Sequence, residues 1–235
     1  MRVGGLIEHL HCASLIIDDI EDGSVQRRGK PCSHSVFGID YAINAANLMY
    51  FLPINKLIAS FTTPELKWRI NEIYLNEMTL CHIGQGLDIK NHKLTTKAEM
   101  PTTEEYIKLT LLKTGGLLRM LVKMMGAVMN IDQQAVDKLT ECMNNVGIAF
   151  QIIDDILNVA NSEECMGKGV VAEDLHERKF TLIVDHLRDN DEFLELFFKK
   201  EKNEAVILKL LQIINESGVL EKCKVKAKDY ADKAL

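Results

Sequence analysis

Apolar residues recur along most of the chain at spacings of three and four, the pattern typical of α-helices with one buried face. This pattern predicts helices over residues 6–20, 41–59, 66–89, 106–129 and 133–160, with shorter ones at 193–198 and 205–217 and a charged tail at 221–235. Strand-like alternation of apolar and polar residues does not occur. We therefore predict an all-α, single-domain antiparallel helical bundle around a central cavity, formed by residues 1–235.

Proline and glycine mark the expected interruptions of this pattern. Pro53 should kink or restart the helix over residues 41–59. Gly115 and Gly116 lie inside the periodic stretch 106–129, where each costs about 1 kcal/mol of helix stability relative to alanine. Close approach of a ligand or of another backbone would explain this glycine pair.

Composition narrows the functional classes. The chain has 235 residues, 47% of them hydrophobic, which suffices for a sizeable core, and its net charge of −6 argues against a nucleic-acid-binding surface. Six cysteines without a C-x-x-C pair indicate reduced thiols in an intracellular protein and no zinc site. Arg119 and Lys123 interrupt the most apolar run, so we expect no transmembrane segment. Because a cleavable leader is also not expected, we predict a cytoplasmic protein.

An acidic cluster, D-D-I-E-D at residues 18–22, follows the first apolar segment. On a helix, Asp22 shares a face with Asp18 and Asp19, at roughly 5–6 Å between Cβ atoms. Their repulsion increases if Gly23 ends the helix, because the cluster then lies at the negative end of the helix dipole. A hard divalent cation such as magnesium, completed by phosphate oxygens of a substrate, would relieve it. The alternative is a solvated acidic turn.

The segment F-Q-I-I-D-D-I-L-N at residues 150–158 repeats this design. Asp155 lies one helical turn after Gln151, and Asn158 lies one turn after Asp154. Two aspartate pairs, each preceded by an apolar helix, predict two carboxylate walls that face each other across a cavity.

Two other glycine motifs do not indicate nucleotide binding. K-T-G-G at residues 113–116 lacks the upstream glycine of a Walker A loop, and G-Q-G-L-D at residues 84–88 lacks the third glycine of a dinucleotide motif. Taken alone, these glycines would be helix breaks, and Arg27, Arg28, Lys168 and Lys179 would be solvated surface cations.

Taken together and in order, these motifs resemble a known family. D-D-I-E-D followed by R-R-G, then G-Q-G-L-D, K-T-G-G and F-Q-I-I-D-D-I-L-N, are similar to those of the trans-isoprenyl diphosphate synthases, most closely the geranylgeranyl diphosphate synthases of animals and fungi. The resemblance extends from about His9 to about Leu220. It implies a prenyltransferase that condenses isopentenyl diphosphate with an allylic diphosphate, here farnesyl diphosphate, to give geranylgeranyl diphosphate.

The resemblance also implies the mechanism and the residues that carry it. Magnesium, about three ions per site, assists ionisation of the allylic diphosphate; condensation and elimination follow without a protein nucleophile. The implied metal ligands are Asp18, Asp19, Asp22, Asp154 and Asp155. The implied catalytic residues are Asp18, Asp19, Asp22, Lys113 and Asp154. The allylic diphosphate would be bound by Arg27, Lys113, Lys168 and Lys179, with Thr114 and Gln151 beside them. The isopentenyl diphosphate would be bound by His11 and Arg28.

Product length and assembly follow from the same resemblance. The small residues Ala13 and Ser14 should leave the product pocket open, and the deeper floor should be formed by Tyr50, Phe51 and His82. Geranylgeranyl diphosphate is then the expected product. We expect a homo-oligomer, a dimer or an assembly of dimers, formed through residues 66–89.

The chain departs from the family pattern at three places. The segment between Lys168 and Lys179 is one residue longer than expected, and Arg178 stands where a glycine is usual. The family's G-K-x-x-R motif, which contributes to the isopentenyl site, should lie well before the aspartates, whereas seventeen residues precede Asp18. We therefore expect the domain to lack its first helices and its last.

Two alternatives to the prenyltransferase remain. A non-catalytic partner subunit of a prenyl synthase would retain the fold without the isopentenyl-binding cations. A terpene cyclase shares the ionisation step but normally carries N-D-x-x-S-x-x-x-E as its second motif, whereas this chain has D-D-I-L-N together with Lys113 and the pair Arg27 and Arg28.

Overall fold

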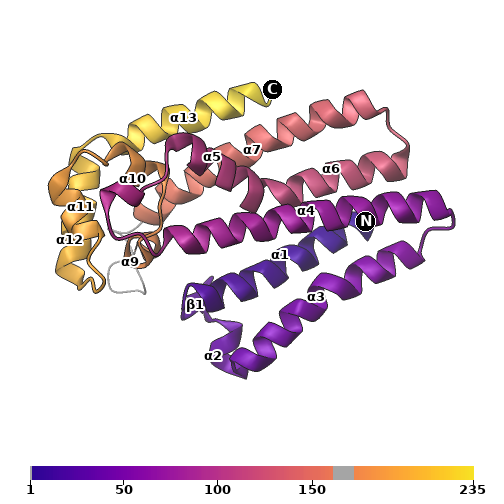
Figure 1. The fold of residues 1–235 in the computed structure, drawn as a ribbon, viewed down its shortest axis with the longest axis horizontal. Helices are drawn as coiled ribbons and strands as arrows, with labels where there is room; N and C mark the ends of the chain where they lie inside the picture. The colour runs from indigo at the N-terminus through magenta and orange to yellow at the C-terminus, as the bar shows by residue number, and fades with distance from the viewer. Residues whose placement is uncertain (1, 161–171) are drawn as a thin grey trace. The chain divides into compact units, whose positions relative to one another are not determined.

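A computed structural model describes residues 2–160 and 172–235 of the chain, which are almost entirely helical (Figure 1). The prediction of an all-α protein is confirmed. The longer helices are α1 (Arg2–Glu21), α3 (Ile39–Ala59), α4 (Pro64–Asn91), α5 (Thr103–Lys113), α6 (Gly115–Met129), α7 (Gln133–Ala160), α12 (Glu204–Glu216) and α13 (Val219–Lys233). The short elements are β1 (Gln26–Arg27), β2 (Lys30–Pro31), α2 (Ser33–Phe37), the 3₁₀ helix η1 (Lys97–Glu99), α9 (Glu173–Glu177), α10 (Leu182–His186) and α11 (Asp191–Phe197).

The helix predictions were right in position, and the structure differs from them in three details. The periodic stretch over residues 106–129 is two helices, because α5 ends at Lys113 and α6 begins at Gly115. Of the two outcomes predicted at Pro53, a kink or a restart, the restart does not occur, because helix α3 continues through this residue. The predicted charged tail is helix α13, because Val219, Cys223 and Ala227 recur every four residues and are buried.

A small hairpin, which the sequence analysis did not predict, follows α1. Strands β1 and β2 pair antiparallel, with Arg27 opposite Lys30. The two residues between them, Arg28 and Gly29, have φ angles of 54° and 74°. Positive φ at both central positions identifies a type I′ turn, whose twist matches that of the paired strands.

The chain forms two compact units. The first, unit 1, comprises the described residues up to Leu80 together with residues 116–140. The second, unit 2, comprises the described residues of 81–115 and 141–235. Each unit has its own hydrophobic core. Helices α4 and α7 each have residues in both units, but α4 contributes only to the core of unit 1 and α7 only to the core of unit 2.

In unit 1, helix α1 packs along α3, and the two helices lie side by side in Figure 1. Leu6, Leu10 and Ala13 recur at helical spacing and are buried against a matching face of α3 that includes Ala46. Because Ala13 and Ala46 are both small and fully buried, the helices can approach closely. The remaining core side chains come from α3, α4 and α6: Tyr50, Ile54, Leu57, Ile70, Ile73, Tyr74, Met120 and Met124.

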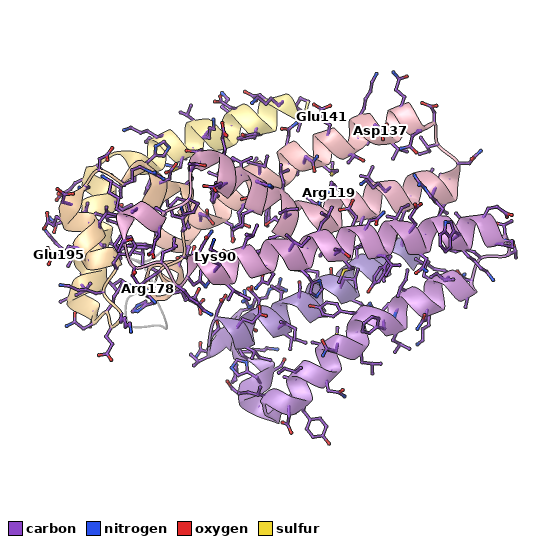
Figure 2. The ribbon with its side chains drawn as sticks, viewed as in Figure 1. Lys90, Arg119, Asp137, Glu141, Arg178 and Glu195 are labelled. Carbon is purple, nitrogen blue, oxygen red and sulfur yellow. The ribbon has the colours of Figure 1, made fainter. Side chains whose placement is uncertain are left out.

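A buried ion cluster joins α4 to α6 within unit 1. The Glu77 carboxylate accepts hydrogen bonds from Arg119 Nε at 2.9 Å and from Lys123 Nζ at 2.6 Å. Arg119 lies on α6, where it is labelled in Figure 2. These cations, which interrupt the apolar run of α6 in the sequence, are therefore compensated by a carboxylate.

In unit 2, the face of α7 formed by Ile148, Ile152, Ile156 and Val159 lies in the core. Helices α10 to α13 supply most of the rest of this core, including the rings of Phe193 and Phe197, which stack at 5.7 Å between centroids. Helix α5 begins with a capping box, in which Thr102 accepts a hydrogen bond from the Glu105 backbone and the Glu105 carboxylate accepts one from the Thr102 backbone.

Over residues 2–160 and 172–235, none of the helices is both long and apolar enough to cross a bilayer.

Candidate active site

The first aspartate motif lies at the C-terminal end of α1, in unit 1. The backbone N–H of Asp22 donates to the carbonyl of Asp18 at 2.9 Å, and that of Ser24 donates to the carbonyl of Asp19 at 3.0 Å. Gly23 has a φ of 70°, which ends the helix as the sequence predicts. The aspartates are therefore at the negative end of the helix, immediately before the hairpin.

Arg27, on strand β1 of that hairpin, compensates this charge. Its Nε and Nη2 atoms donate to the same carboxylate oxygen of Asp19, at 2.8 and 2.5 Å, and Nη2 lies 3.8 Å from an oxygen of Asp18. Asp19 is buried, whereas Asp18 and Asp22 are half-buried. The hairpin thus brings the arginine predicted to bind a diphosphate directly against the aspartates predicted to bind metal.

The other predicted residues of unit 1 divide between the core and the surface. Ala13 and the mostly buried Tyr50 belong to one core, and the Tyr50 carbonyl accepts a hydrogen bond from Tyr74. Ser14 donates to the carbonyl of His11 at 2.9 Å, so both lie on the same stretch of α1. In contrast, Phe51 is 61% exposed. Arg28, at the turn, is also exposed, as is His82, which belongs to unit 2.

In unit 2, Lys113 forms an ion pair with Asp88, with 2.5 Å between Nζ and Oδ2. The two residues come from α5 and α4, which touch where Gly84 faces the end of α5. A Cβ atom at Gly84 would lie 2.6 Å from the backbone nitrogen of Lys113. Since Asp88 follows Gly84 by one helical turn, this close approach brings the carboxylate within reach of the lysine.

Asp88 is a buried carboxylate surrounded by cations. Burial by itself would raise its pKa, but the hydrogen bond with His92 and the charges of Lys113 and Lys179 outweigh burial, so the pKa lies well below its usual value. Asp88 is therefore ionised at neutral pH and holds Lys113 in place. Asp88 was not among the predicted site residues, although its position in G-Q-G-L-D offered a signal.

The second aspartate pair lies on α7. Asp154 is exposed, whereas Asp155 is only 2% exposed. Asp155 accepts hydrogen bonds from Tyr106 and Gln151, and Gln151 in turn accepts one from Thr114. Burial raises the pKa of Asp155 to about 7; the nearby Lys179 lowers it, and the nearby Asp174 raises it further. Tyr106 is a further residue that the sequence analysis missed, since nothing in its local sequence distinguishes it from a core tyrosine.

Lys179 lies beside Asp174, with 3.3 Å between Nζ and Oδ1. Asp174 is buried, and its backbone N–H donates to the side-chain oxygen of Asn158 at 3.3 Å. Arg178, labelled in Figure 2, ends α9 with a φ of 60°. Glycine adopts this conformation without strain, which explains why the family pattern has a glycine here. Lys168 lies outside the described residues.

The carboxylates of the two motifs differ in how well they suit a divalent cation. Asp18 and Asp22 in unit 1 and Asp154 in unit 2 are at least partly exposed and carry the oxygen ligands that magnesium prefers. Asp19 has an oxygen bonded by Arg27, and both oxygens of Asp155 are engaged by Tyr106 and Gln151. The donor sets therefore fit a hard cation in each unit taken by itself, at Asp18 and Asp22 in unit 1 and at Asp154 in unit 2.

Comparison with known proteins identifies the family. The polyprenyl synthetase model matches residues 1–214, most of the chain. The chain belongs to this family. The resemblance inferred from the ordered motifs is thereby confirmed.

Relatives within the polyprenyl synthetase family are named as synthases. A geranylgeranyl pyrophosphate synthase of Neocamarosporium betae is 38% identical over 93% of this chain, and one from Metarhizium anisopliae is 37% identical over 96%. The chain spans 61% and 65% of the lengths of these two proteins.

Solved structures of the family have the same fold. Geranylgeranyl pyrophosphate synthetase from Pyrococcus horikoshii matches the whole chain with a TM-score of 0.85 and 30% identity, and the match covers 71% of that protein. Polyprenyl synthase from Caulobacter crescentus, solved with calcium and isoprenyl diphosphate, matches 99% of the chain and 70% of its own length, with a TM-score of 0.84 and 25% identity.

Proposed function

We propose that this chain is a prenyltransferase that condenses isopentenyl diphosphate with farnesyl diphosphate to give geranylgeranyl diphosphate. The observation that carries the proposal is the presence of both aspartate motifs and K-T-G-G in a chain whose relatives are named geranylgeranyl pyrophosphate synthases. The Caulobacter relative, solved with calcium and isoprenyl diphosphate, supports a divalent metal and a prenyl diphosphate as the ligands.

Cations of the chain would bind the diphosphate. Lys113 and Lys179 are both half-buried and are held by Asp88 and Asp174, so their ammonium groups are fixed before a ligand arrives. Fixed cations stabilise charge that develops on a departing group without having to reorganise. Arg27, held by Asp19, would act in the same way.

Magnesium is the metal we propose, bound in unit 1 by Asp18 and Asp22, with Asp19 beside them, and in unit 2 by Asp154. Bound to diphosphate oxygens, it would neutralise the charge of the leaving group. The hydrogen bonds from Arg27 would hold the Asp19 carboxylate in its orientation. His11 and Arg28 remain our candidates for binding the isopentenyl diphosphate.

The activity is tested by incubating the chain with farnesyl diphosphate, labelled isopentenyl diphosphate and magnesium. We expect a labelled C20 diphosphate that disappears when magnesium is chelated. Asp19→Ala and Asp154→Ala should each lower turnover by orders of magnitude, because diphosphate charge is then left uncompensated.

The control is Asp137→Ala, which removes an exposed carboxylate from α7 that bonds only its own helix neighbour Gln133 among the contacts described for it. Asp137→Ala should retain wild-type turnover. Unchanged turnover in Asp19→Ala, in a wild-type chain shown to be active, would contradict the proposed role of the first motif.

Product length is a finer part of this proposal. We propose that Ala13 and Ser14 leave room for a C20 chain in unit 1. Ala13→Phe should then shift the product to farnesyl diphosphate when geranyl diphosphate is supplied. Urea unfolding of the variant is measured alongside, because Ala13 is fully buried. A folded Ala13→Phe chain that still makes the C20 product would contradict the pocket assignment.

We also propose that the chain forms a homodimer through α4. Within unit 1, Trp68 and Leu75 are 71% and 55% exposed and are seven residues apart, so they share one face of this helix. Large apolar side chains that share an exposed face are typical of an interaction surface. A second copy of the chain, presenting the same face across a two-fold axis, would cover both.

A further inference from the structure

Four side chains of unit 2 form a continuous chain of hydrogen bonds. Tyr106 on α5 donates to Asp155 Oδ2 on α7 at 2.7 Å, and Gln151 Nε2 donates to Asp155 Oδ1 at 2.9 Å. Thr114, the residue that ends α5, donates to Gln151 Oε1 at 2.7 Å. We call this set of four residues the α5–α7 clip.

The clip orients each of its members. The Gln151 NH₂ group can only donate hydrogen bonds, and it donates to Asp155, which leaves the carbonyl oxygen of the amide as the acceptor on its other side. The Gln151 carbonyl oxygen then faces the Thr114 hydroxyl, which must donate to it. Because Asp155 is 2% exposed and Tyr106 is 3% exposed, a broken contact would leave a buried polar atom without a partner.

The clip also fixes α5 in two places, one near its start and one at its end. Tyr106 and Thr114 are eight residues apart, which corresponds to about 12 Å along the helix. They bind Asp155 and Gln151, which are one turn apart on α7. Lys113 immediately precedes Thr114, so the clip holds the segment from which its ammonium group reaches Asp88.

We propose that Asp155 is a positioning residue and not a metal ligand, and that with Tyr106 it fixes Gln151, Thr114 and, through them, Lys113. This inference rests on the proposed function, because it concerns the diphosphate that Lys113 is proposed to bind. Asp154, the exposed neighbour, is the metal ligand of the pair. Tyr106 thereby gains a role at a distance from the diphosphate, which it does not touch.

The first test separates positioning from metal binding. Binding of farnesyl diphosphate to the chain is followed by calorimetry while the magnesium concentration is varied. Asp154→Asn should raise the magnesium concentration for half-maximal binding about tenfold or more. Asp155→Asn should keep this magnesium concentration within about twofold of the wild-type value, while weakening the binding of farnesyl diphosphate itself. An equal shift in both variants would overturn the assignment of Asp155.

The second test is a double-mutant cycle between the two ends of the clip. Tyr106→Phe and Thr114→Val should each weaken the binding of farnesyl diphosphate about tenfold, which is the usual effect of losing one hydrogen bond to a charged group. Sites this far apart normally act independently, which would give a loss of about a hundredfold in the double variant. If both residues act through the clip, the double variant should lose no more than about tenfold in affinity for farnesyl diphosphate. A hundredfold loss would refute transmission through Asp155 and Gln151.

The control is Tyr41→Phe, the same chemical change at a tyrosine of α3 that is largely exposed. It should leave binding unchanged. If the wild-type chain bound no farnesyl diphosphate, the proposed function would fail. The clip would then be judged from the equilibrium constant of unfolding: coupling between Tyr106→Phe and Thr114→Val would support it, and independent effects would refute it.

Discussion

Asp154 and Asp155 are adjacent in the sequence but have opposite environments. The first is exposed, and the second is buried with both oxygens hydrogen-bonded. Burial raises the pKa of Asp155 to about 7, against an ordinary value of 3.8. In the folded chain this carboxyl therefore retains its proton over a pH range in which the unfolded chain has lost it.

This difference predicts a pH-dependent stability. Between about pH 4 and pH 7 the folded state binds one more proton at Asp155 than the unfolded state, so stability should fall as the pH rises, by on the order of 1 kcal/mol per pH unit. Urea unfolding, measured with a chelator at several pH values, compares the wild type with Asp155→Asn. The wild type should lose free energy of unfolding relative to the variant as the pH rises.

Other titrating groups contribute equally to the free energy of unfolding of the wild type and of Asp155→Asn, so their contributions cancel in the difference. The pKa values of His176 and His186 are lowered, mainly by burial, and these groups act in the opposite direction in both chains. A difference that is constant from pH 4 to pH 7 would show that Asp155 is ionised throughout.

The sequence could not distinguish these two aspartates. In F-Q-I-I-D-D-I-L-N both helix faces carry apolar residues, so periodicity does not reveal which aspartate points inward. The exposed face includes Phe150 and Leu157, while Ile152 and Ile156 are buried. Burial of Asp155 depends on Tyr106, 49 residues earlier in the chain, and such a partner is visible only in the fold.

Among the elements, long helices were predictable and their junctions were not. Apolar spacing gives the same signal for one helix or two, so it did not reveal the break at Thr114. The hairpin was missed because strands of two residues are too short to show alternation, although the dipeptide Arg28-Gly29 is compatible with a type I′ turn. Helix α13 was missed because charges outnumber its apolar residues.

The contact between α4 and α5 gives a prediction at this scale. Gly84→Ala would place a Cβ 2.6 Å from the backbone nitrogen of Lys113 and 2.8 Å from Leu112 Cβ. Backbone must then move, so we expect a loss of about 1–3 kcal/mol in the free energy of unfolding. Displacement of Lys113 from Asp88 should also weaken the binding of farnesyl diphosphate.

Gly86→Ala is the matched control on the same helix. An alanine Cβ there would meet no atom of the described residues within 4 Å. Alanine favours a helix over glycine by about 1 kcal/mol, so Gly86→Ala should be stabilising. If urea unfolding gave the two substitutions the same sign, close packing at Gly84 would not be the cause.

For the whole molecule, the exposed face of α4 predicts association. Sedimentation equilibrium at micromolar concentration should give a dimer for the wild type and a monomer for Trp68→Glu/Leu75→Glu, because buried carboxylates without partners oppose the interface. Val225→Glu on α13, also largely exposed, is the control and should remain a dimer. A monomeric wild type would rule out the dimer.

At position 28, in the turn of the hairpin, folding stability and the proposed ligand binding favour different residues. Arg28 is exposed and has a φ of 54°, a conformation that costs an arginine about 1–2 kcal/mol and glycine almost nothing. Arg28→Gly should therefore make the chain more stable towards urea, by about 1 kcal/mol, while calorimetry shows weaker binding of isopentenyl diphosphate. Selection for stability alone would favour a glycine here. With the proposed role of Arg28 in binding isopentenyl diphosphate, the strained arginine would exchange folding stability for ligand affinity.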